Sequence, residues 1–578
     1  MTLRQLLEEH LSAALQEAGA PPGTPALVGP ATRPEFGDYQ ANGVMAVAKR
    51  LKTNPRQLAE KVIGALDADG LIETAEVAGP GFINIALDNA WLAEYLGRAL
   101  ADERLGVDRA ESPQKIVVDY SAPNLAKEMH VGHLRTTVIG DALVRVLEFL
   151  GHQVIRHNHV GDWGTQFGML IAYMDRLEQE GRDVLSAELG DLEKFYQSAR
   201  KLFDDDPEFA DLSRKNVVKL QGGDARCRRM WQHFIEESLR HCQQVYDRLG
   251  ITLSPADVRG ESAYNDDLSQ VVEELRQKNL LTESAGAQCV FLDEFKKKDG
   301  EILPVIVQKS DGGYLYSTSD LAAVRYRSQV LGVDRILYIV DARQSLHLQQ
   351  IFATARAAGF AAENISLEHH SFGTIKGKDG KPFGTRKGGL VKLMDLLEEA
   401  EERAFDMVGE KNPDLPGEQR REIARTIGIS SIKYADLSLN RTTDYIYDWN
   451  RMLSLEGNTA PYLQYSYTRV QSIFRRGGLD EISADACLLI AEKAERALAV
   501  KLAQFAEAVE VVSRDCYPNL LCNYLCELAE AFMRFYESCP VLKADEPVRT
   551  SRLQLCRLAA RTIQMGLGLL GIETVERM

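Results

Sequence analysis

The sequence lacks the marks of several protein classes. Its nine cysteines include no Cys-x-x-Cys pair, so neither a zinc ribbon nor a disulfide framework is predicted, and the cysteines are expected to be reduced core residues. No apolar run approaches the length of a membrane span. The N-terminal segment carries Glu8, Glu9 and Glu17 in an amphipathic helical pattern, unlike a secretory signal. We therefore expect a cytoplasmic chain with no metal site and no membrane partner.

Positive charge is also scarce. The chain has 68 Lys and Arg residues against 84 Asp and Glu residues, a formal net charge of -16. This balance argues against indiscriminate nucleic-acid binding, because sequence-independent affinity comes from neutralised phosphates. A structured RNA could still bind to a local basic and aromatic surface. The length of 578 residues exceeds what one hydrophobic core supports and predicts three to four domains.

The most informative stretch runs from Lys115 to Gly168 and has the pattern of one βαβ unit. The apolar run 116–118 is typical of a buried parallel strand, and Gly151 ends the helix that follows. A return strand begins at Val154. Apolar residues recur at helical spacing between the two strands, at Leu134, Val138, Ala142, Val146 and Leu150. The stretch predicts a Rossmann-type parallel sheet whose ligand crevice lies at the carboxyl ends of its strands.

The motif His130-Val131-Gly132-His133 lies between the first predicted strand and the helix that follows it. Two imidazoles three residues apart at a helix N-terminus direct donors toward one point, and the helix dipole adds partial positive charge. Gly132 has no Cβ, so a base or ribose can approach the backbone. An isolated motif of this kind occurs by chance. Within a strand-helix-strand unit, however, it predicts that His130, Gly132 and His133 bind a nucleotide phosphate.

DYSAPNLAKEMHVGHLRTT, followed by NHVGDWGTQFG, resembles the corresponding region of class I aminoacyl-tRNA synthetases, and closely that of the arginyl-tRNA synthetases. The resemblance extends from Phe36 to the terminal VERM. It implies ligation of L-arginine to its cognate tRNA through an arginyl-adenylate, with ATP converted to AMP and pyrophosphate and the arginyl group transferred to the 2′-OH of the terminal adenosine. The implied partners are arginine, tRNA and ATP with Mg²⁺, and a monomer is expected.

We expect the parallel sheet to resume with the apolar runs 302–307 and 336–340, each followed by a helical pattern. The arginine pocket is expected beyond these later strands. Tyr316 and Asp320 lie one helical turn apart, and Asp320 offers the negative charge that a guanidinium requires, although an Asp at a helix start is often only an N-terminal charge. The resemblance implies that Tyr316, Asp320 and Gln344 line the pocket together with Asn124. Asp119 matches an acidic position of the same pocket.

A glycine-rich basic loop follows, from Lys376 to Gly389. Its backbone donors and its charges suit a triphosphate. The loop does not fit a Walker A motif, and it departs from the KMSKS motif of the synthetases. Its candidate phosphate ligands are Lys378, Lys381, Arg386 and Lys387, and the sequence leaves the choice among them open. The resemblance implies that Lys127 supplies the missing charge and joins His130 and His133 as a catalytic group.

Two aromatic regions predict RNA contacts. Phe82 and Asn84 share one face of a strand, which places a stacking ring beside an amide, although core packing of Phe82 is the alternative. The resemblance implies that this pair contacts the tRNA D-loop. The second region is helical and rich in Tyr and Arg, and a core stripe is the rival interpretation there. By resemblance, the residues around the anticodon are Tyr462, Tyr465, Tyr536 and Met578.

The predicted fold is multidomain, α/β followed by all-α. Residues 1–112 are expected to form an added N-terminal α/β domain, 113–400 the catalytic domain with a helical insertion at about 175–295, and 401–578 a helical anticodon-binding bundle. Two rival functions share part of this pattern. A small-molecule nucleotidylyltransferase fails on length and on the aromatic helical C-terminal part. A silent RNA-binding relative is disfavoured because both histidines, Lys127 and the acidic pocket are present.

Overall fold

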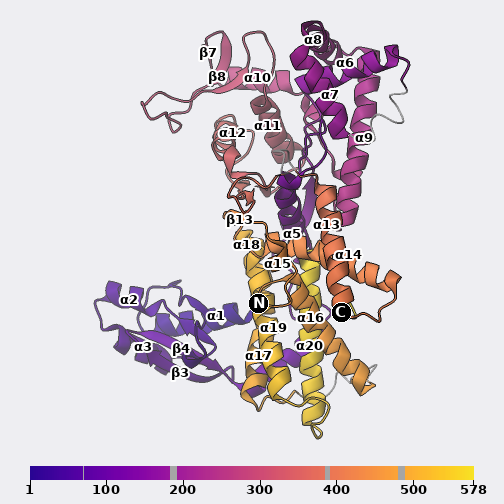
Figure 1. The fold of residues 1–578 in the computed structure, drawn as a ribbon. Helices are drawn as coiled ribbons and strands as arrows, with labels where there is room; N and C mark the ends of the chain where they lie inside the picture. The colour runs from indigo at the N-terminus through magenta and orange to yellow at the C-terminus, as the bar shows by residue number, and fades with distance from the viewer. Residues whose placement is uncertain (69, 183–191, 385–390, 479–487) are drawn as a thin grey trace. The chain divides into compact units, whose positions relative to one another are not determined.

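The computed structural model describes residues 1–578 except 69, 183–191, 385–390 and 479–487 (Figure 1). The chain divides into two compact units. Unit 1 comprises Met1–Ala110, Leu453–Leu569 and Glu573–Met578, and unit 2 comprises Glu111–Met452 and Leu570–Ile572. This division follows packing rather than sequence order. The three expected domains, 1–112, 113–400 and 401–578, therefore stay a prediction.

Unit 2 is built on a parallel four-stranded sheet, as the sequence predicts. Its strand order is β11 (Ser366–His369), β10 (Arg335–Tyr338), β5 (Lys115–Asp119) and β6 (Gln153–His157). The run 116–118 is fully buried because β5 lies in the sheet interior. Helix α5 (Leu134–Phe149) connects β5 to β6. The register aligns Tyr338, Asp119 and His157 across the carboxyl ends of three strands.

The insertion is mainly helical, as expected, but a second sheet begins within its last residues and continues beyond residue 295. Strands β7 (Leu281–Ser284), β8 (Ala287–Val290) and β9 (Val305–Gln308) pair antiparallel. We expected the run containing β9 to resume the parallel sheet, and this expectation is wrong. The physical reason is visible in its burial, because Ile306 is 41% exposed between two buried valines. Such alternation belongs to a sheet with one solvated face.

The remaining elements of unit 2 are helices and two short strands. Helix α6 (Thr165–Gln179) leads into the insertion, which holds α7 (Leu192–Asp205), α8 (Pro207–Gln221), α9 (Ala225–Leu249) and α10 (Leu268–Gln277). The rest are α11 (Tyr316–Arg325), the π-helical turn η6 (Tyr326–Val330), α12 (Ser345–Ala357), β12 (Ile375–Lys376), α13 (Leu393–Lys411), α14 (Gly417–Leu437), β13 (Tyr445–Ile446) and α15 (Trp449–Met452).

Unit 1 begins with the expected small α/β module. Its antiparallel sheet has the order β1 (Val28–Pro30), β2 (Tyr39–Ala41), β4 (Phe82–Leu87) and β3 (Ile72–Ala78). Its helices are α1 (Leu3–Glu17), α2 (Val44–Leu51), α3 (Pro55–Gly64) and α4 (Asn89–Ala101). Along β4 the residues alternate between buried and half-buried. Ile83, Ile85 and Leu87 therefore form the core, and Phe82 and Asn84 occupy the other face.

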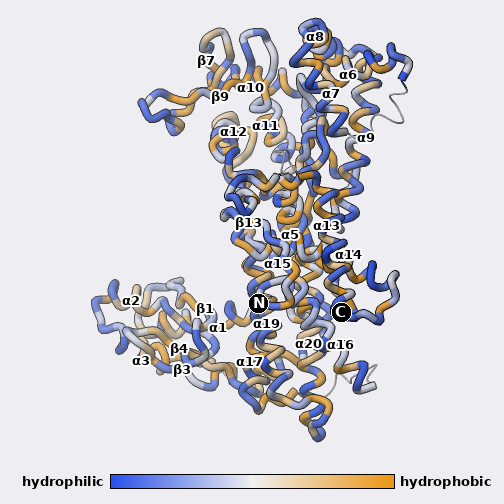
Figure 2. Tube along the Cα trace, viewed as in Figure 1, coloured by the Kyte–Doolittle hydropathy of each residue, from blue (hydrophilic) through white to orange (hydrophobic). Residues whose placement is uncertain are grey.

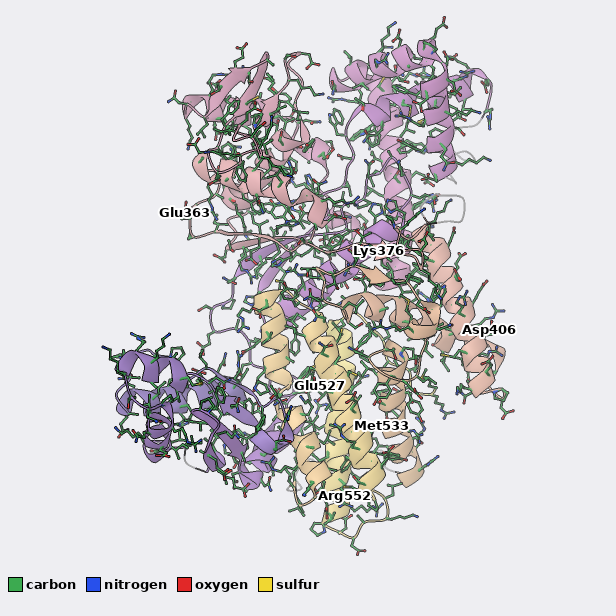
Figure 3. All side chains as sticks on the ribbon, turned by 60° about the vertical axis from the view of Figure 1, so that its left-hand side comes forward. Glu363, Lys376, Asp406, Glu527, Met533 and Arg552 are labelled. Carbon is green, nitrogen blue, oxygen red and sulfur yellow. The ribbon has the colours of Figure 1, made fainter. Side chains whose placement is uncertain are left out.

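The second part of unit 1 is the predicted helical bundle. It contains α16 (Ala460–Gly477), α17 (Lys493–Ala503), α18 (Phe505–Asp515), α19 (Asn519–Ser538) and α20 (Val548–Leu569). Arg552, labelled on α20 in Figure 3, forms a buried 2.7 Å ion pair with Glu495 of α17. Hydrophilic and hydrophobic residues are interleaved along the helices in Figure 2. Throughout the described ranges, every helix is too short or too polar to cross a bilayer.

Candidate active site and RNA-binding surfaces

The turn that leaves β5 is strained. Ser121 and Ala122 have φ values of 68° and 45°, a left-handed conformation that costs non-glycine residues about 1 to 3 kcal/mol each. Hydrogen bonds hold the turn in place. The Ser121 amide donates to Thr136 Oγ1 and the Ala122 amide donates to Asn158 Oδ1, both at 3.0 Å. Groups from α5 and from the segment after β6 thus fix the path of the chain toward the HVGH motif.

The two motif histidines lie together at the start of α5, with ring centres 4.0 Å apart. His130 Nδ1 accepts from the Gly132 amide at 3.0 Å, and His133 Nδ1 accepts from the His130 amide at 3.1 Å. In the neutral ring the hydrogen therefore resides on Nε2 in both residues. Burial lowers the pKa of His133 to about 3. It also lowers the pKa of His130, with the Lys127 ammonium as a second cause.

These contacts define the protonation state of the two histidines and add a second role for Gly132. The histidines are neutral hydrogen-bond donors near pH 7, so they offer directed Nε2–H groups rather than full charges. A Cβ on Gly132 would lie 2.7 Å from His130 Cε1. The glycine is thus required by the His130 ring that folds over it, in addition to any approach by a nucleotide.

Lys127 is exposed on the segment before the motif. Its ammonium lies 4.6 Å from the ring centre of Tyr196 on α7, at cation–π distance. The insertion therefore reaches the residue that we expect to supply charge to the phosphates. Sequence reasoning did not find Tyr196, because 69 residues of chain separate the two side chains.

The basic loop is described up to residue 384. Lys376 pairs with Asp444 at 2.7 Å, and Lys378 pairs with Asp448 at 3.3 Å. Lys381 is exposed. Arg386 and Lys387 lie outside the described residues. Beyond them, the chain returns beside the motif, since the Val131 amide donates to the Val391 carbonyl and the Leu393 amide donates to the Met129 carbonyl.

The predicted arginine residues Tyr316 and Asp320 lie one turn apart at the start of α11. His347 Nε2 on α12 donates to Asp320 Oδ2 at 2.6 Å, and its ring centre lies 4.8 Å from that of Tyr316. His159 Nε2, two residues beyond β6, is 3.9 Å from Asp320 Oδ1. Burial, followed by the charges of Asp320 and Asp162, raises the pKa of Glu261 to about 7. Asp320, Asp162 and Glu261 therefore lie close enough to influence one another, and together they offer carboxyl groups to a cation.

Asp119 has a partner of its own. Its Oδ2 accepts from Arg327 Nη2 at 2.7 Å, and the Arg327 side chain is fully buried. Because a guanidinium stays protonated, this carboxylate is already neutralised within the chain. Asn124 uses Oδ1 to accept from the Ala126 amide, and Gln344 is exposed in a turn before α12. Within the described residues, no hydrogen bond joins either side chain to Asp320.

In unit 1, the structure brings two of the predicted RNA-binding tyrosines together. Arg469 on α16 donates from Nε to Tyr465 Oη at 2.7 Å, and its guanidinium lies 5.8 Å from the ring centre of Tyr536 on α19. Arg469 was not predicted, although its position four residues after Tyr465 on one helix was a usable signal. Tyr462 is half-buried. In the N-terminal module, Asn84 Oδ1 accepts from Gln40 Nε2 at 2.7 Å.

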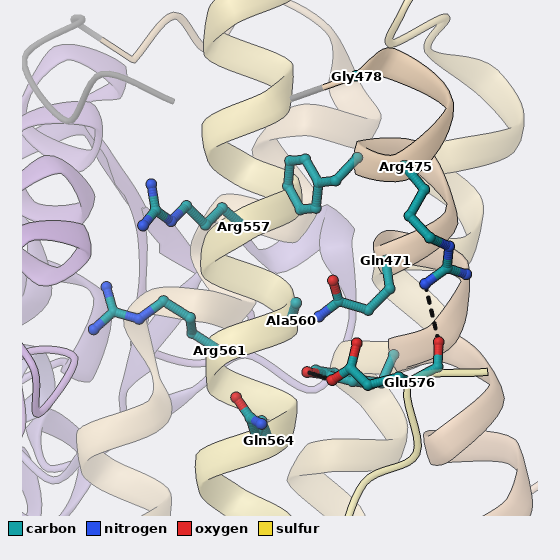
Figure 4. A pocket seen from close by; sticks show the side chains of 10 residues that line it. Gln471, Arg475, Gly478, Arg557, Ala560, Arg561, Gln564 and Glu576 are labelled. Atoms are coloured by element: carbon teal, nitrogen blue, oxygen red, sulfur yellow. Dashed lines mark hydrogen bonds between the residues drawn. The ribbon is translucent and has the colours of Figure 1, made fainter. Parts of the chain in front are cut away.

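The C-terminal segment is packed down, as expected from its composition. Leu569, Leu570 and Ile572 are buried, and Met578 is half-buried. Tyr467 Oη donates to Glu576 Oε1 at 3.1 Å, and Arg475 donates to the Glu576 carbonyl at 3.0 Å. A pocket of about 610 Å³ lies here between α16 and α20 (Figure 4). Arg557 and Arg561 of its lining extend side by side, away from Arg475.

Comparison with known families covers most of the chain. Residues 95–449 match the model described as tRNA synthetases class I (R), catalytic domain. Residues 463–578 match the DALR anticodon binding domain, and residues 5–87 match the arginyl tRNA synthetase N terminal domain.

Individual relatives match over their full length. The curated arginine–tRNA ligases of Hahella chejuensis and Laribacter hongkongensis are 59% and 58% identical over 578 residues, covering 100% of each chain. The arginyl-tRNA synthetase structures from Plasmodium falciparum and Thermus thermophilus align with TM-scores of 0.87 and 0.84 at 30% and 26% identity, again with 100% coverage of both chains. This chain therefore belongs to the arginyl-tRNA synthetase family of class I aminoacyl-tRNA synthetases.

Proposed function

We propose that the protein ligates L-arginine to its cognate tRNA, converting ATP to AMP and pyrophosphate. The observation that carries the proposal is the sequence identity of 59% and 58% to two arginine–tRNA ligases over the whole chain. The local chemistry supports it. Unit 2 holds two neutral imidazole donors suited to phosphate oxygens and the Asp320 carboxylate, close to further acidic side chains, suited to a guanidinium.

In the first step, the arginine carboxylate attacks the α-phosphorus of ATP. A carboxylate–phosphate bond forms while the bond to pyrophosphate breaks. His130 and His133 donate Nε2–H bonds to the phosphate oxygens, where negative charge develops, and the Lys127 ammonium supplies positive charge. Further charge comes from the basic loop, with Lys378, Lys381, Arg386 and Lys387 as candidates. Asp320 and Tyr316 hold the guanidinium, and Asn124, Gln344 and Asp119 complete the pocket.

ATP is expected as its Mg²⁺ complex, since Mg²⁺ usually binds through substrate phosphates and neutralises their charge. The donors around the motif fit such a substrate, because both imidazoles present an N–H group that can donate to phosphate oxygens. The chain's own residues then orient the triphosphate and the arginine for in-line attack.

In the second step, the 2′-OH of the terminal adenosine attacks the adenylate carbonyl, its proton is lost, and AMP leaves. Recognition of the tRNA body uses Phe82 and Asn84 at the D-loop and Tyr462, Tyr465, Tyr536 and Met578 at the anticodon. Half-exposed aromatic rings suit unpaired bases, which stack on aromatic faces. We also propose a cytoplasmic monomer, and light scattering of the purified chain tests its oligomeric state.

The decisive experiment is ATP–pyrophosphate exchange with arginine, followed by aminoacylation of arginine tRNA. Exchange with arginine but not with lysine or citrulline, and charging of the tRNA, is the expected result. Exchange without arginine would identify a nucleotidylyltransferase. Absence of both activities in folded protein would identify a silent relative.

A further inference from the structure

One side chain touches both residues expected to recognise arginine. His347 donates from Nε2 to Asp320 Oδ2 at 2.6 Å, and its ring lies against that of Tyr316 with centres 4.8 Å apart. The His347 side chain is 19% exposed and that of Asp320 is 26% exposed. A hydrogen bond to a carboxylate that is largely removed from water is stronger than one on an open surface.

The imidazole is held on a rigid element. His347 lies in the first turn of α12, whose Leu348, Ile351 and Thr354 are buried. Asp320 lies on α11, which packs against α12. The contact therefore joins two packed helices and fixes the orientation of the carboxylate. Because His347 uses one oxygen of Asp320, Oδ1 and the outer lone pairs remain for a ligand.

Orientation matters for this ligand. A guanidinium pairs best with a carboxylate when two parallel N–H bonds form in one plane. A carboxylate free to rotate loses entropy when it is fixed by the substrate, whereas one already held by the protein does not. His159 lies on the other side, 3.9 Å from Oδ1, and so brackets the same group.

We propose that His347 is a positioning residue for arginine, acting through Asp320 and Tyr316 without touching the reacting atoms. This inference rests on the proposed function of Asp320 as the guanidinium ligand. It assigns a specificity role to a side chain 27 residues from its partner in the sequence.

The first test compares three substitutions of His347. Gln can place an amide N–H near the position of Nε2, Asn is too short to reach it, and Leu fills the volume without a donor. His347→Leu and His347→Asn should raise the arginine KM about tenfold or more, since a hydrogen bond to a charged group is lost. His347→Gln should recover most of the affinity. The ATP KM should stay within about twofold in all three.

The matched control is His241→Leu. His241 forms a similar imidazole–carboxylate contact with Glu237, at 3.3 Å and with similar exposure, on α9. Its substitution should change neither KM. A His347→Gln variant as impaired as His347→Leu, or equal rises in the arginine and ATP KM values, would overturn the positioning role.

The second test is a double-mutant cycle with Asp320→Asn. If His347 acts through Asp320, the double variant should bind arginine no worse than Asp320→Asn alone. Multiplicative losses would show an independent role and refute the proposal. If Asp320→Asn leaves the arginine KM unchanged, the arginine site itself is wrong and the inference fails with it. Failure of the His347 assignment alone leaves the Asp320→Asn effect intact.

Discussion

The carboxyl edge of the parallel sheet and the helical bundle, where we propose RNA contacts, hold their side chains in different ways. At the sheet edge, each key group is fixed by another: His133 by the His130 amide, Asp320 by His347, and Asp119 by Arg327. In the bundle, Tyr462, Tyr465 and Tyr536 are half-buried, and the rings of Tyr465 and Tyr536 lie near the Arg469 guanidinium. Chemistry needs atoms placed to within a fraction of an ångström, whereas stacking on a base tolerates an open ring.

The largest expected effect is the dependence of adenylate formation on bound tRNA. It tests whether the active site at the sheet edge works independently of the helical bundle. The loop lysines Lys376 and Lys378 are engaged with Asp444 and Asp448, and the loop departs from the KMSKS motif. Both features suggest that bound RNA is needed to free the loop for ATP. We predict that adenylate formation depends on bound tRNA. ATP–pyrophosphate exchange should be close to background without RNA and should appear on adding arginine tRNA but not a non-cognate tRNA. Full exchange without RNA would refute the coupling.

The next largest effect should be the loss of rate when one of the two fixed imidazole donors is removed. His133→Ala should lower kcat for exchange by roughly 10² to 10³, the usual cost of losing a donor to developing charge. Because burial lowers the pKa of His133 to about 3, this group stays neutral above about pH 5, and it should contribute no titration to the rate between pH 5 and 8. An unchanged rate, or a melting point lowered enough to explain the loss, would contradict the assignment.

The open RNA surface should respond more mildly. A chain ending at Val575 loses Met578 and the Glu576 contacts to Tyr467 and Arg475. Stacking contributes about 1 to 3 kcal/mol per base, so the KM for tRNA should rise about tenfold. The arginine and ATP KM values in tRNA-saturated assays serve as the internal control. A tRNA KM that does not move in a folded, truncated chain would remove the C-terminus from the recognition surface.

The smallest expected effect concerns the pH dependence of the free energy of unfolding, with activity unchanged. Glu507 Oε1 accepts from Tyr39 Oη at 2.6 Å and from the Arg4 amide at 2.9 Å, and burial raises the pKa of Glu507 to about 7. The folded state therefore binds a proton that the unfolded state releases above about pH 4.5, so stability falls as the pH rises from 4.5 through 7.

Glu507→Gln should remove this fall. Urea unfolding at pH 5 and pH 8 should show the wild-type chain losing roughly 1 to 3 kcal/mol relative to the variant across that interval. Exchange activity with saturating tRNA should be unaffected, since Glu507 belongs to unit 1 and not to the chemistry. Parallel pH curves for the two proteins would show that the carboxyl group is not protonated in the folded state.

The sequence by itself determined the βαβ unit and the position of the motif. The buried run 116–118, the helical spacing of α5 and the return strand are local patterns, set by strand and helix periods that neighbouring residues reveal. The same holds for Phe82 and Asn84, whose common face follows from the two-residue period of a strand. The turn of helix that carries Tyr316 and Asp320 was also readable from spacing alone.

Only the tertiary structure decided which distant groups meet. The pairing of β9 with β8, the ion pair of Asp119 with Arg327 across 208 residues, and the bond from His347 to Asp320 leave no periodic trace in the sequence. Each exists because burial removes water from polar groups and forces them to find partners wherever the packed elements bring them. The partners come from distant parts of the chain: Arg327 neutralises Asp119, and His347 orients Asp320. In the sequence, both are simply acidic residues.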